Sequence, residues 1–290
     1  MVEIKNETLT INIQEAGAEL DSIYNKKNGL QYLWNGDPSV WPKKSPILFP
    51  TVGELKNKTY YFEGKSYQLS RHGFAREMDF TVHDQTDNTA SFILTSDSIT
   101  LSKFPFEFRF EIRYGINGNK LSVTYIITNT GSKEMLFSVG GHPAFKLPLV
   151  DGTAYTDYYL EFEKKETADR WPISKDGLIE IDPVAWFNNE NRLPLKKELF
   201  LQDALVFKNL HSNKVSLKSP VTSHGLEFDF TGFPYLGIWA AKNADFVCIE
   251  PWCGIADSVS SDQQLVNKEG MNKLKEGEKF ERSWSVSFFS

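Results

Sequence analysis

Residues 106–114 have the sequence FEFRFEIRY, in which apolar and charged side chains alternate at every position. Successive side chains of a β-strand point to opposite faces, so this period of two predicts a strand with one apolar and one charged face. Asn117-Gly118 follows and favours the positive φ angles of a type I′ turn. Alternation then resumes from Leu121 to Ile127. Residues 106–128 therefore predict a β-hairpin whose Phe106, Phe108 and Phe110 face a core.

Similar alternation predicts further strands along the chain. They are expected at residues 8–13, 59–69 with a turn at Glu63-Gly64, 80–95, 135–139, 158–163, 213–219, 224–230, 235–240, 245–250 and 283–289. Residues 263–274 are the single modest candidate for an amphipathic helix. Many antiparallel strands without intervening helices indicate a sandwich or barrel. The polar stretch 163–191 is interpreted as a long excursion, because strands of the same kind resume beyond it. We expect an all-β protein in which residues 1–290 form a single large antiparallel β-sandwich domain.

Composition narrows the class of partner. The chain has 32 Lys and Arg against 38 Asp and Glu, a net charge of −6 and a pI near 5.5. Nucleic-acid binding usually requires a basic surface, so no nucleic-acid partner is expected. Residues 1–7 lack the apolar run of a signal peptide, and no window reaches the roughly 18 apolar residues of a membrane span. We expect a cytoplasmic protein without a membrane partner, with Cys248 and Cys253 as reduced thiols in or near the core.

Two of the five histidines lie in unusual local sequence. His142 follows Gly140-Gly141 and precedes Pro143, so its imidazole is expected on a stiff turn that allows close approach of the backbone. A turn that merely ends a strand would need the glycines and the proline but not the histidine. His72 lies close to Arg71 and Arg76. Two nearby guanidiniums disfavour the imidazolium, so His72 is expected to be a neutral hydrogen-bonding group. A solvated loop remains the alternative for His72.

A carboxylate supplies the third candidate. Residues 246–249 are apolar on both faces, which predicts a central covered strand, and Glu250 is placed where that strand surfaces. Partial burial raises the pKa of a carboxyl group towards the range of a base that works near neutral pH. Trp252 would provide an apolar wall beside it, of the kind that stacks on sugar rings. The alternative is a glutamate that simply ends a strand.

Together, three motifs resemble those of the aldose 1-epimerase (galactose mutarotase) family in their order and separation. They are Arg71-His72-Gly73-Phe74, Gly141-His142-Pro143 with Phe145, and Glu250-Pro251-Trp252. Three more segments are similar to the lactose-operon-associated bacterial branch of that family. These are Phe49-Pro50-Thr51-Val52-Gly53, the tract from Tyr67 to Phe80, and Lys268-Glu269-Gly270-Met271. The resemblance covers about residues 8 to 288.

The resemblance implies a β-supersandwich that binds a hexose on its concave face and interconverts the α and β anomers without a cofactor or a required metal. It assigns Glu250 as the base, His142 as the general acid and His72 as the group that steadies the ring oxygen. It places Asp203 on the sugar hydroxyls. Many relatives have Arg where this chain has Glu54, and Arg71 or Arg76 is the expected replacement in sugar binding. Trp252 and Phe145 are expected to flank the acid and base, and the protein to be a monomer or homodimer.

The residue types fit this chemistry, because ring opening needs one base for the C1 hydroxyl and one acid for the ring oxygen. Three alternatives stay open. Arg71, Arg76, Lys56 and Lys58 could clamp the phosphate of a hexose 6-phosphate. Two histidines and a carboxylate could form a facial triad that holds iron or manganese. A sensing protein could bind sugar without turnover. A glycosidase is less favoured, because it would need two placed carboxylates and the sequence clearly indicates one.

Overall fold

The computed structural model describes all 290 residues, and β-strands dominate it. One sheet of four strands has the order β1 (Val2–Lys5), β2 (Leu9–Ile13), β3 (Leu20–Asn25) and β4 (Leu30–Gln31). Two small ribbons pair β6 (Thr59–Phe62) with β7 (Lys65–Gln68), and β12 (Met135–Phe137) with β22 (Asn272–Leu274). The single α-helix is α1 (Ser98–Lys103), and no helix has the length and apolar character needed to cross a membrane.

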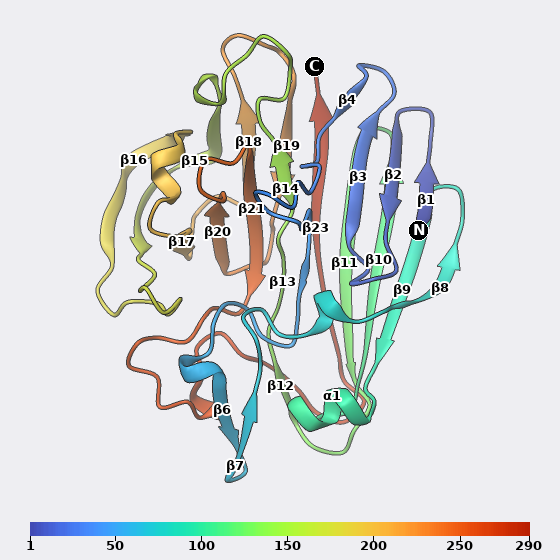
Figure 1. Cartoon of the computed structure of the whole chain (residues 1–290), viewed down its shortest axis with the longest axis vertical. Helices are drawn as coiled ribbons and strands as arrows, with labels where there is room; N and C mark the ends of the chain where they lie inside the picture. Colours follow the sequence, from blue (N-terminus) through green and yellow to red (C-terminus); the bar gives the residue numbers. More distant parts are fainter.

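The remaining fifteen strands form one large sheet in which neighbouring strands are antiparallel. Its order is β5 (Ile47–Leu48), β13 (Val139–Gly141), β21 (Phe246–Cys253), β20 (Tyr235–Trp239), β17 (Leu205–Lys208), β15 (Tyr159–Trp171), β18 (Lys214–Lys218), β19 (Gly225–Asp229), β23 (Lys279–Phe289), β11 (Lys120–Asn129), β10 (Phe108–Asn117), β9 (Thr89–Thr95) and β8 (Thr81–Gln85). β14 (Ala144–Lys146) also pairs with β21, and β16 (Val184–Pro194) pairs with β15. Figure 1 shows β9, β10, β11 and β23 side by side, with β15, β16 and β17 on the other flank of the molecule. The all-β prediction is confirmed.

The predicted hairpin is present as β10 and β11, with Phe108 opposite Asn129 and Asn117 opposite Lys120. Its turn differs by one residue from the prediction. Gly118 and Asn119 are the central residues, and only Gly118 has a positive φ, of 56°. That is the pattern of a type II′ turn, which places glycine first. The Glu63-Gly64 turn has positive φ at both residues, as a type I′ turn requires.

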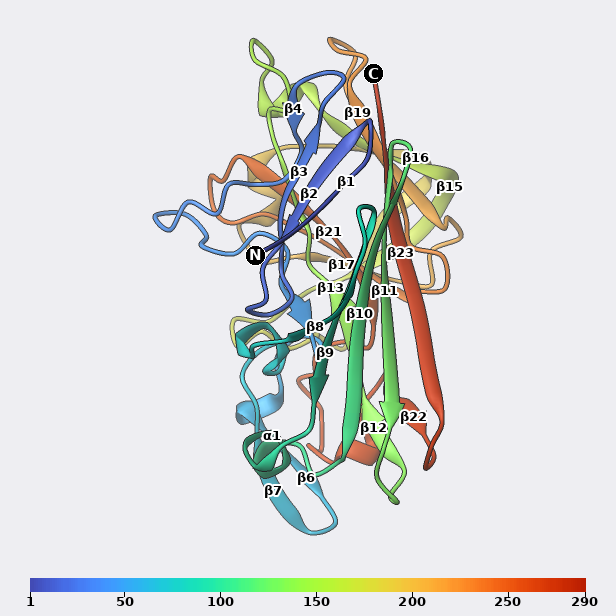
Figure 2. The same ribbon diagram turned by 90° about the vertical axis from the view of Figure 1, so that its right-hand side faces the viewer.

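The aromatic face of β10 lies in the core, as its alternation predicts. Phe106, Phe108 and Phe110 are 3% exposed or less, and they belong to a continuous cluster of 72 buried apolar residues. This cluster reaches from β1 to β23 and includes side chains from both the four-stranded and the large sheet, which lie one against the other in Figure 2. The single-domain assignment stays a prediction, and this continuous core supports it.

The prediction of a helix at residues 263–274 is wrong. The segment contains a 3₁₀ turn at Leu265–Asn267, then Gly270 with a φ of +75°, and then β22, which pairs with β12. Gly270 takes the left-handed conformation that interrupts a helix. Only Leu265 and Leu274 of this segment are buried, so an apolar helical face is missing. The other 3₁₀ turns are Lys56–Lys58, Ala75–Glu77, Tyr155–Asp157 and Lys197–Phe200.

The stretch interpreted as an excursion, residues 163–191, is largely paired strand. β15 and β16 run antiparallel, with register shifts near Glu166 and Asp169, and β16 pairs with no other strand. Most of their side chains are exposed or half-buried on both faces. Because such a ribbon needs no apolar face, its sequence lacks the alternation by which a strand is recognised.

Candidate functional site

The seven candidate residues predicted from the sequence line one cavity of about 300 Å³. Arg71, His72 and Arg76 reach it from the segment that follows β7, Asp203 from the segment before β17, and the others from the large sheet. The full lining is Trp41, Arg71, His72, Arg76, His142, Asp203, Ala204, Trp239, Glu250 and Trp252. Residues up to 211 positions apart, Trp41 and Trp252, thus line one small cavity, and their individual roles stay predictions.

Glu250 lies in the middle of β21, a strand that is buried along its whole length. Every residue of β21 is buried, and Glu250 itself is 1% exposed. β20 pairs with β21 on one side, placing Gly237 opposite Glu250, while β13 and β14 pair with it on the other. The apolar run before Glu250 forms the central strand that the sequence predicts, but the strand continues to Cys253, so Glu250 is almost fully buried and is not placed where the strand surfaces.

His142 is held against this strand by the connection between β13 and β14. Its Nε2 lies 3.3 Å from Oε2 of Glu250. A Cβ on Gly140 would come within 2.8 Å of Cδ1 of Trp252, and one on Gly141 within 2.7 Å of the Tyr125 hydroxyl. The backbone before His142 thus makes the close approach that the paired glycines predict, and this brings the imidazole onto the carboxyl group.

Burial sets the protonation of this pair in the empty cavity. It raises the pKa of Glu250 well above its usual value, a rise that the Arg71 guanidinium opposes. Burial, with smaller contributions from Arg71 and Arg76, lowers the pKa of His142 to about 3. The one proton of the pair therefore lies on Glu250 before substrate binds. The roles predicted from the sequence would instead require that proton on His142.

His72 is neutral for a reason visible in its contacts. The backbone N–H of Gly53 donates a hydrogen bond to its Nδ1 over 3.0 Å, so the ring proton is on Nε2. Burial, with smaller contributions from Arg71, His142 and Arg76, lowers its pKa well below the usual value. This agrees with the expected neutral state, although burial contributes more than the two arginines. The imidazole of His72 lies edge-on to that of His142, with ring centres 5.7 Å apart.

Arg71 and Asp203 form an ion pair at the mouth of the cavity. The two guanidinium NH groups of Arg71 donate to the carboxylate of Asp203 at 3.2 Å. Asp203 also accepts from the backbone N–H of Ala204 and has a φ of 99°, a conformation that is uncommon for a residue other than glycine. Arg76 is more enclosed, and its buried Nε has no hydrogen-bond partner.

Two tryptophans of the site were missed by the sequence analysis. Trp41 stacks on His142 with ring centres 5.0 Å apart, and Trp239 meets the same imidazole edge-on at 5.5 Å. Trp41 lies in a loop whose sequence has no hydrophobic periodicity, so no sequence pattern indicated that it belongs to the site. Trp239 could have been found, because antiparallel pairing of the predicted strands 235–240 and 245–250 places it on the same face as Glu250.

Unpaired polar atoms concentrate at this cavity. Eight buried side-chain nitrogen or oxygen atoms in the protein have no hydrogen-bond partner, and four of them belong to cavity residues: Arg76 Nε, His142 Nδ1, Glu250 Oε2 and Trp252 Nε1. Burying a polar atom without a partner is costly, so such atoms usually mark a functional requirement.

Two flanking assignments are corrected. Phe145 is fully buried against Phe228 in the core and does not line the cavity. The expected phosphate clamp does not include Lys56, whose ammonium group donates to the backbone oxygens of Val259 and Ser261. Lys58 lies at a different depression. Glu54 also stands outside the cavity lining, whereas Arg71 and Arg76 are part of it.

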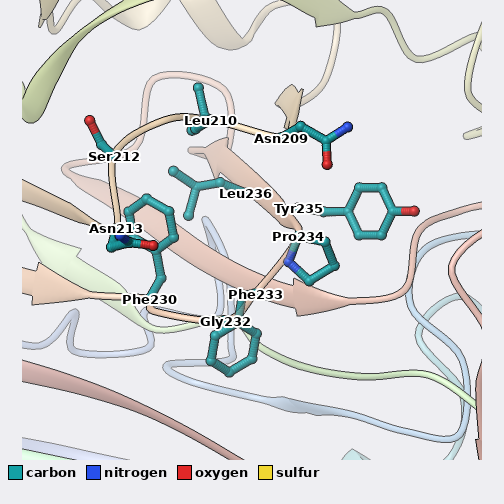
Figure 3. Close-up of a pocket in the computed structure, with 10 residues that line it drawn as sticks. All are labelled: Asn209, Leu210, Ser212, Asn213, Phe230, Gly232, Phe233, Pro234, Tyr235 and Leu236. Atoms are coloured by element: carbon teal, nitrogen blue, oxygen red, sulfur yellow. The ribbon is translucent and has the colours of Figure 1, made fainter.

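Larger cavities elsewhere lack an acid–base pair of this kind. One of about 660 Å³ lies over β8 to β11; its lining includes His83 and Asp84, which are both exposed, and Glu111, which is paired with Arg109 and Arg113. Another, of about 360 Å³, lies between the turns before β18 and β20 (Figure 3). Its lining contains no carboxylate, imidazole, lysine or arginine. Cavity size therefore does not select the site, whereas the side-chain chemistry does.

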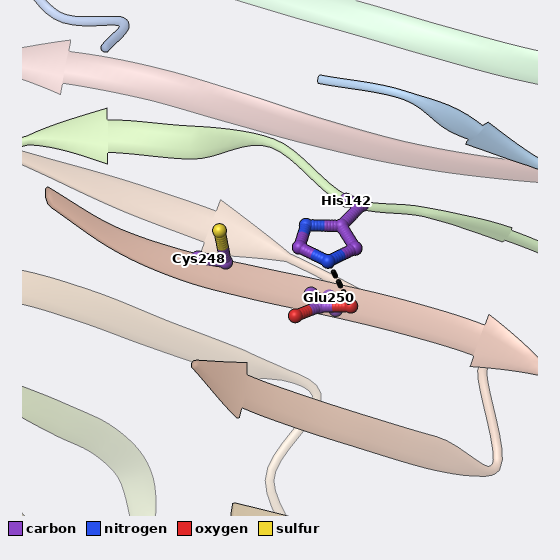
Figure 4. A group of neighbouring side chains, drawn as sticks. All are labelled: His142, Cys248 and Glu250. Carbon is purple, nitrogen blue, oxygen red and sulfur yellow. Dashed lines mark ion pairs between the residues drawn. The ribbon is translucent and has the colours of Figure 1, made fainter. Parts of the chain in front are cut away.

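The only metal-type grouping found consists of His142, Cys248 and Glu250, each with one ligand atom within 4.8 Å of the others (Figure 4). It differs from the facial triad considered above, because His72 is not part of it. Cys248 and Cys253 are both free and buried, as expected.

Comparison with known proteins agrees with this geometry. A family model described as aldose 1-epimerase matches residues 1–287. Protein LacX (chromosomal) of Lactococcus lactis subsp. lactis is 32% identical over 298 aligned residues, covering 100% of this chain and 99% of that protein. A galactose mutarotase related enzyme from Lactobacillus acidophilus is 34% identical with a TM-score of 0.94, covering 100% of this chain and 97% of that one. A galactose mutarotase-like protein from Lactobacillus casei is also 34% identical, with a TM-score of 0.93 and 99% coverage of both chains. The predicted supersandwich fold and the resemblance to the lactose-operon-associated branch are confirmed, and the chain belongs to the aldose 1-epimerase family.

Proposed function

We propose that this protein is a mutarotase, which interconverts the α and β anomers of a hexose by opening and closing its ring. The observation that carries the proposal is the pair formed by His142 Nε2 and Glu250 Oε2, 3.3 Å apart. Both reacting oxygens of the sugar, the C1 hydroxyl and the ring oxygen, are bonded to C1 and lie next to each other. An acid and a base placed this close can act on both at once.

Substrate binding causes the proton transfer from Glu250 to His142 that the proposed reaction needs. Oε2 of Glu250 has no hydrogen-bond partner within the protein. A sugar hydroxyl that donates to it stabilises the carboxylate and lowers its pKa. The proton then moves the short distance to Nε2 of His142, where the stacked indole of Trp41 favours the imidazolium. Glu250 is thereby ready as the base and His142 as the acid.

The ring then opens in one balanced step. Glu250 removes the proton of the C1 hydroxyl, the bond between C1 and the ring oxygen breaks, and His142 protonates the released oxygen. C1 becomes an aldehyde carbon, rotates about its bond to C2, and is attacked from its other face with the two proton transfers reversed. His72, with its proton on Nε2, is suited to donate a hydrogen bond to the ring oxygen throughout.

A hexose 6-phosphate is the second candidate substrate, and one observation favours it. Nε of Arg76 is buried without a hydrogen-bond partner, with Oε1 of Glu77 3.8 Å away, and both Arg76 and Arg71 line the cavity. Guanidinium groups bind phosphate well. The clamp would consist of these two arginines alone, since Lys56 and Lys58 lie elsewhere.

Polarimetry on freshly dissolved α-glucose, α-galactose and α-glucose 6-phosphate tests both candidates. Accelerated approach to the anomeric equilibrium with the free sugars supports the principal proposal. A kcat/KM at least tenfold higher on the phosphate selects the second candidate. No acceleration with any of the three, together with measurable binding, would favour a sugar-sensing protein and contradict catalysis.

A further inference from the structure

Cys248 is the one member of the cluster in Figure 4 that the proposed reaction leaves without a role. It and Glu250 are alternate residues of β21, so their side chains share a face of the sheet. Ala144 of β14 pairs with Cys248, which brings the connection that carries His142 across this face. One thiol, one imidazole and one carboxyl group therefore converge from two adjacent strands onto one buried point.

We propose that His142, Cys248 and Glu250 form an inhibitory binding site for Zn²⁺. Thiolate, imidazole and carboxylate are the three ligand types that zinc uses in proteins. In a tetrahedral site with ordinary zinc bond lengths, ligand atoms lie about 3.5 Å apart. The His142 and Glu250 atoms have that spacing already, at 3.3 Å. The sulfur lies within 4.8 Å of one imidazole nitrogen of His142 and one carboxyl oxygen of Glu250, so it has to approach by about 1 Å.

Charge balance favours a divalent cation at this depth. Zn²⁺ displaces the proton of the Cys248 thiol and that of the Glu250 carboxyl group into solvent, and two anionic ligands then neutralise the metal. The Arg71 and Arg76 guanidiniums oppose the cation, although Asp203 offsets Arg71. His72 is neutral. Mg²⁺ and Ca²⁺ require oxygen ligands and are not expected to bind here.

Occupation of the site would block catalysis, because the metal takes both the acid and the base. This consequence rests on the proposed function, whereas metal binding itself does not. The fourth coordination position would face the cavity, where a sugar hydroxyl or water can reach it. Excess sugar is therefore expected either to leave the inhibition unchanged or to weaken it by competing with Zn²⁺ for the site.

Titration of the full-length protein with Co²⁺ tests the site without reference to activity. A cobalt–thiolate bond produces charge-transfer absorption in the near ultraviolet, and Zn²⁺ should abolish it by displacement. We expect this absorption in the wild type and in Cys253→Ser, and its loss in Cys248→Ser. Cys253 is a matched control, since it is a buried thiol of the same strand at an odd spacing from Cys248, on the opposite face. Cys248→Ala is the second variant, in case a buried serine impairs folding.

The inhibition arm uses the polarimetric rate at increasing Zn²⁺. The concentration for half inhibition should rise at least tenfold in Cys248→Ser or Cys248→Ala and stay unchanged in Cys253→Ser. Absence of thiolate–cobalt absorption in the wild type would overturn the proposal, and so would equal absorption in the Cys248 variants. If the cobalt site forms but no sugar is turned over, the metal site stands and the mutarotase proposal fails.

Discussion

Nε2 of His142 and Oε2 of Glu250 lie 3.3 Å apart in a cavity that buries both side chains, with only one proton to share between them. Burial places that proton on the carboxyl group, so the empty site holds two neutral side chains. This avoids the cost of burying two charges before substrate binds. In the proposed reaction, a polar ligand supplies the missing hydrogen bonds, the proton moves to His142, and Glu250 is left as the base.

Replacing the acid should separate rate from binding. His142→Gln keeps a polar side chain of similar size but cannot carry the transferred proton. We expect kcat to fall by about 10²- to 10⁴-fold, the usual contribution of a general acid or base, with sugar affinity changed little. Polarimetry and calorimetric titration measure the two quantities. Affinity that falls in step with activity would instead indicate a binding role for His142.

The buried carboxyl group should make stability depend on pH. The pKa of Glu250 is higher in the folded than in the unfolded protein. The group therefore contributes fully to the free energy of unfolding below its pKa in the unfolded chain, near 4.5. This contribution is lost as pH rises towards its pKa in the folded protein. Glu250→Gln removes this loss. The unfolding free energy of the variant relative to the wild type should therefore increase above pH 4.5, by up to about 1.4 kcal/mol per pH unit. Denaturant titrations at several pH values measure the slope, and a constant difference between pH 5 and 7 would contradict the buried, protonated state.

The ion pair between Arg71 and Asp203 should contribute more to substrate binding than to the free energy of unfolding. Its side chains are 39% and 22% exposed, and ion pairs of this kind contribute about 0–1 kcal/mol. Asp203→Asn should therefore change the unfolding free energy by less than about 1 kcal/mol while raising KM, because the carboxylate is expected to bind sugar hydroxyls. A large loss of stability with unchanged KM would show that the pair is structural.

Close approach at Gly140 should be essential for the site. A Cβ there would lie 2.8 Å from Cδ1 of Trp252 and 3.0 Å from the Pro251 oxygen, which β21 holds in place. Gly140→Ala should destabilise the fold by about 1–3 kcal/mol, as overpacking does, and lower activity by displacing Trp252 and Glu250. Gly115→Ala is the matched control, because the nearest atom to its Cβ is 3.9 Å away and its φ is not positive. Equal stability and equal activity of the two variants would show that the close approach at Gly140 is not required.

Period-two alternation predicted the hairpin at residues 106–128, because β10 and β11 each have one largely buried and one more solvated face, whereas the fully buried β21 was predicted from its apolar run. The order of the fifteen-stranded sheet could not be predicted, since pairs such as β11 with β23 join segments about 160 residues apart. The β15–β16 ribbon was missed because both of its faces are largely solvated. The false helix at 263–274 reflects a pattern too short to outweigh Gly270.

For the site, sequence motifs brought His72, His142 and Glu250 together correctly because each lies in a stretch with distinctive glycine, proline or apolar neighbours. Trp41 could not be found in this way, since its position over His142 depends on a loop fixed by tertiary contacts, including the hydrogen bond from the Trp34 indole to its backbone oxygen. The location of the proton on Glu250 was also inaccessible, because it depends on the degree of burial.

The central claim is that Glu250 is the base of a mutarotase, and the rate of Glu250→Gln measured beside its sugar affinity tests it most directly. Glutamine preserves the shape and hydrogen-bonding capacity of the side chain but cannot accept the C1 proton. We predict that polarimetry will show mutarotation of α-galactose or α-glucose reduced to the uncatalysed rate, while calorimetry finds the affinity nearly unchanged. A variant that retains more than a tenth of the wild-type rate would contradict the account.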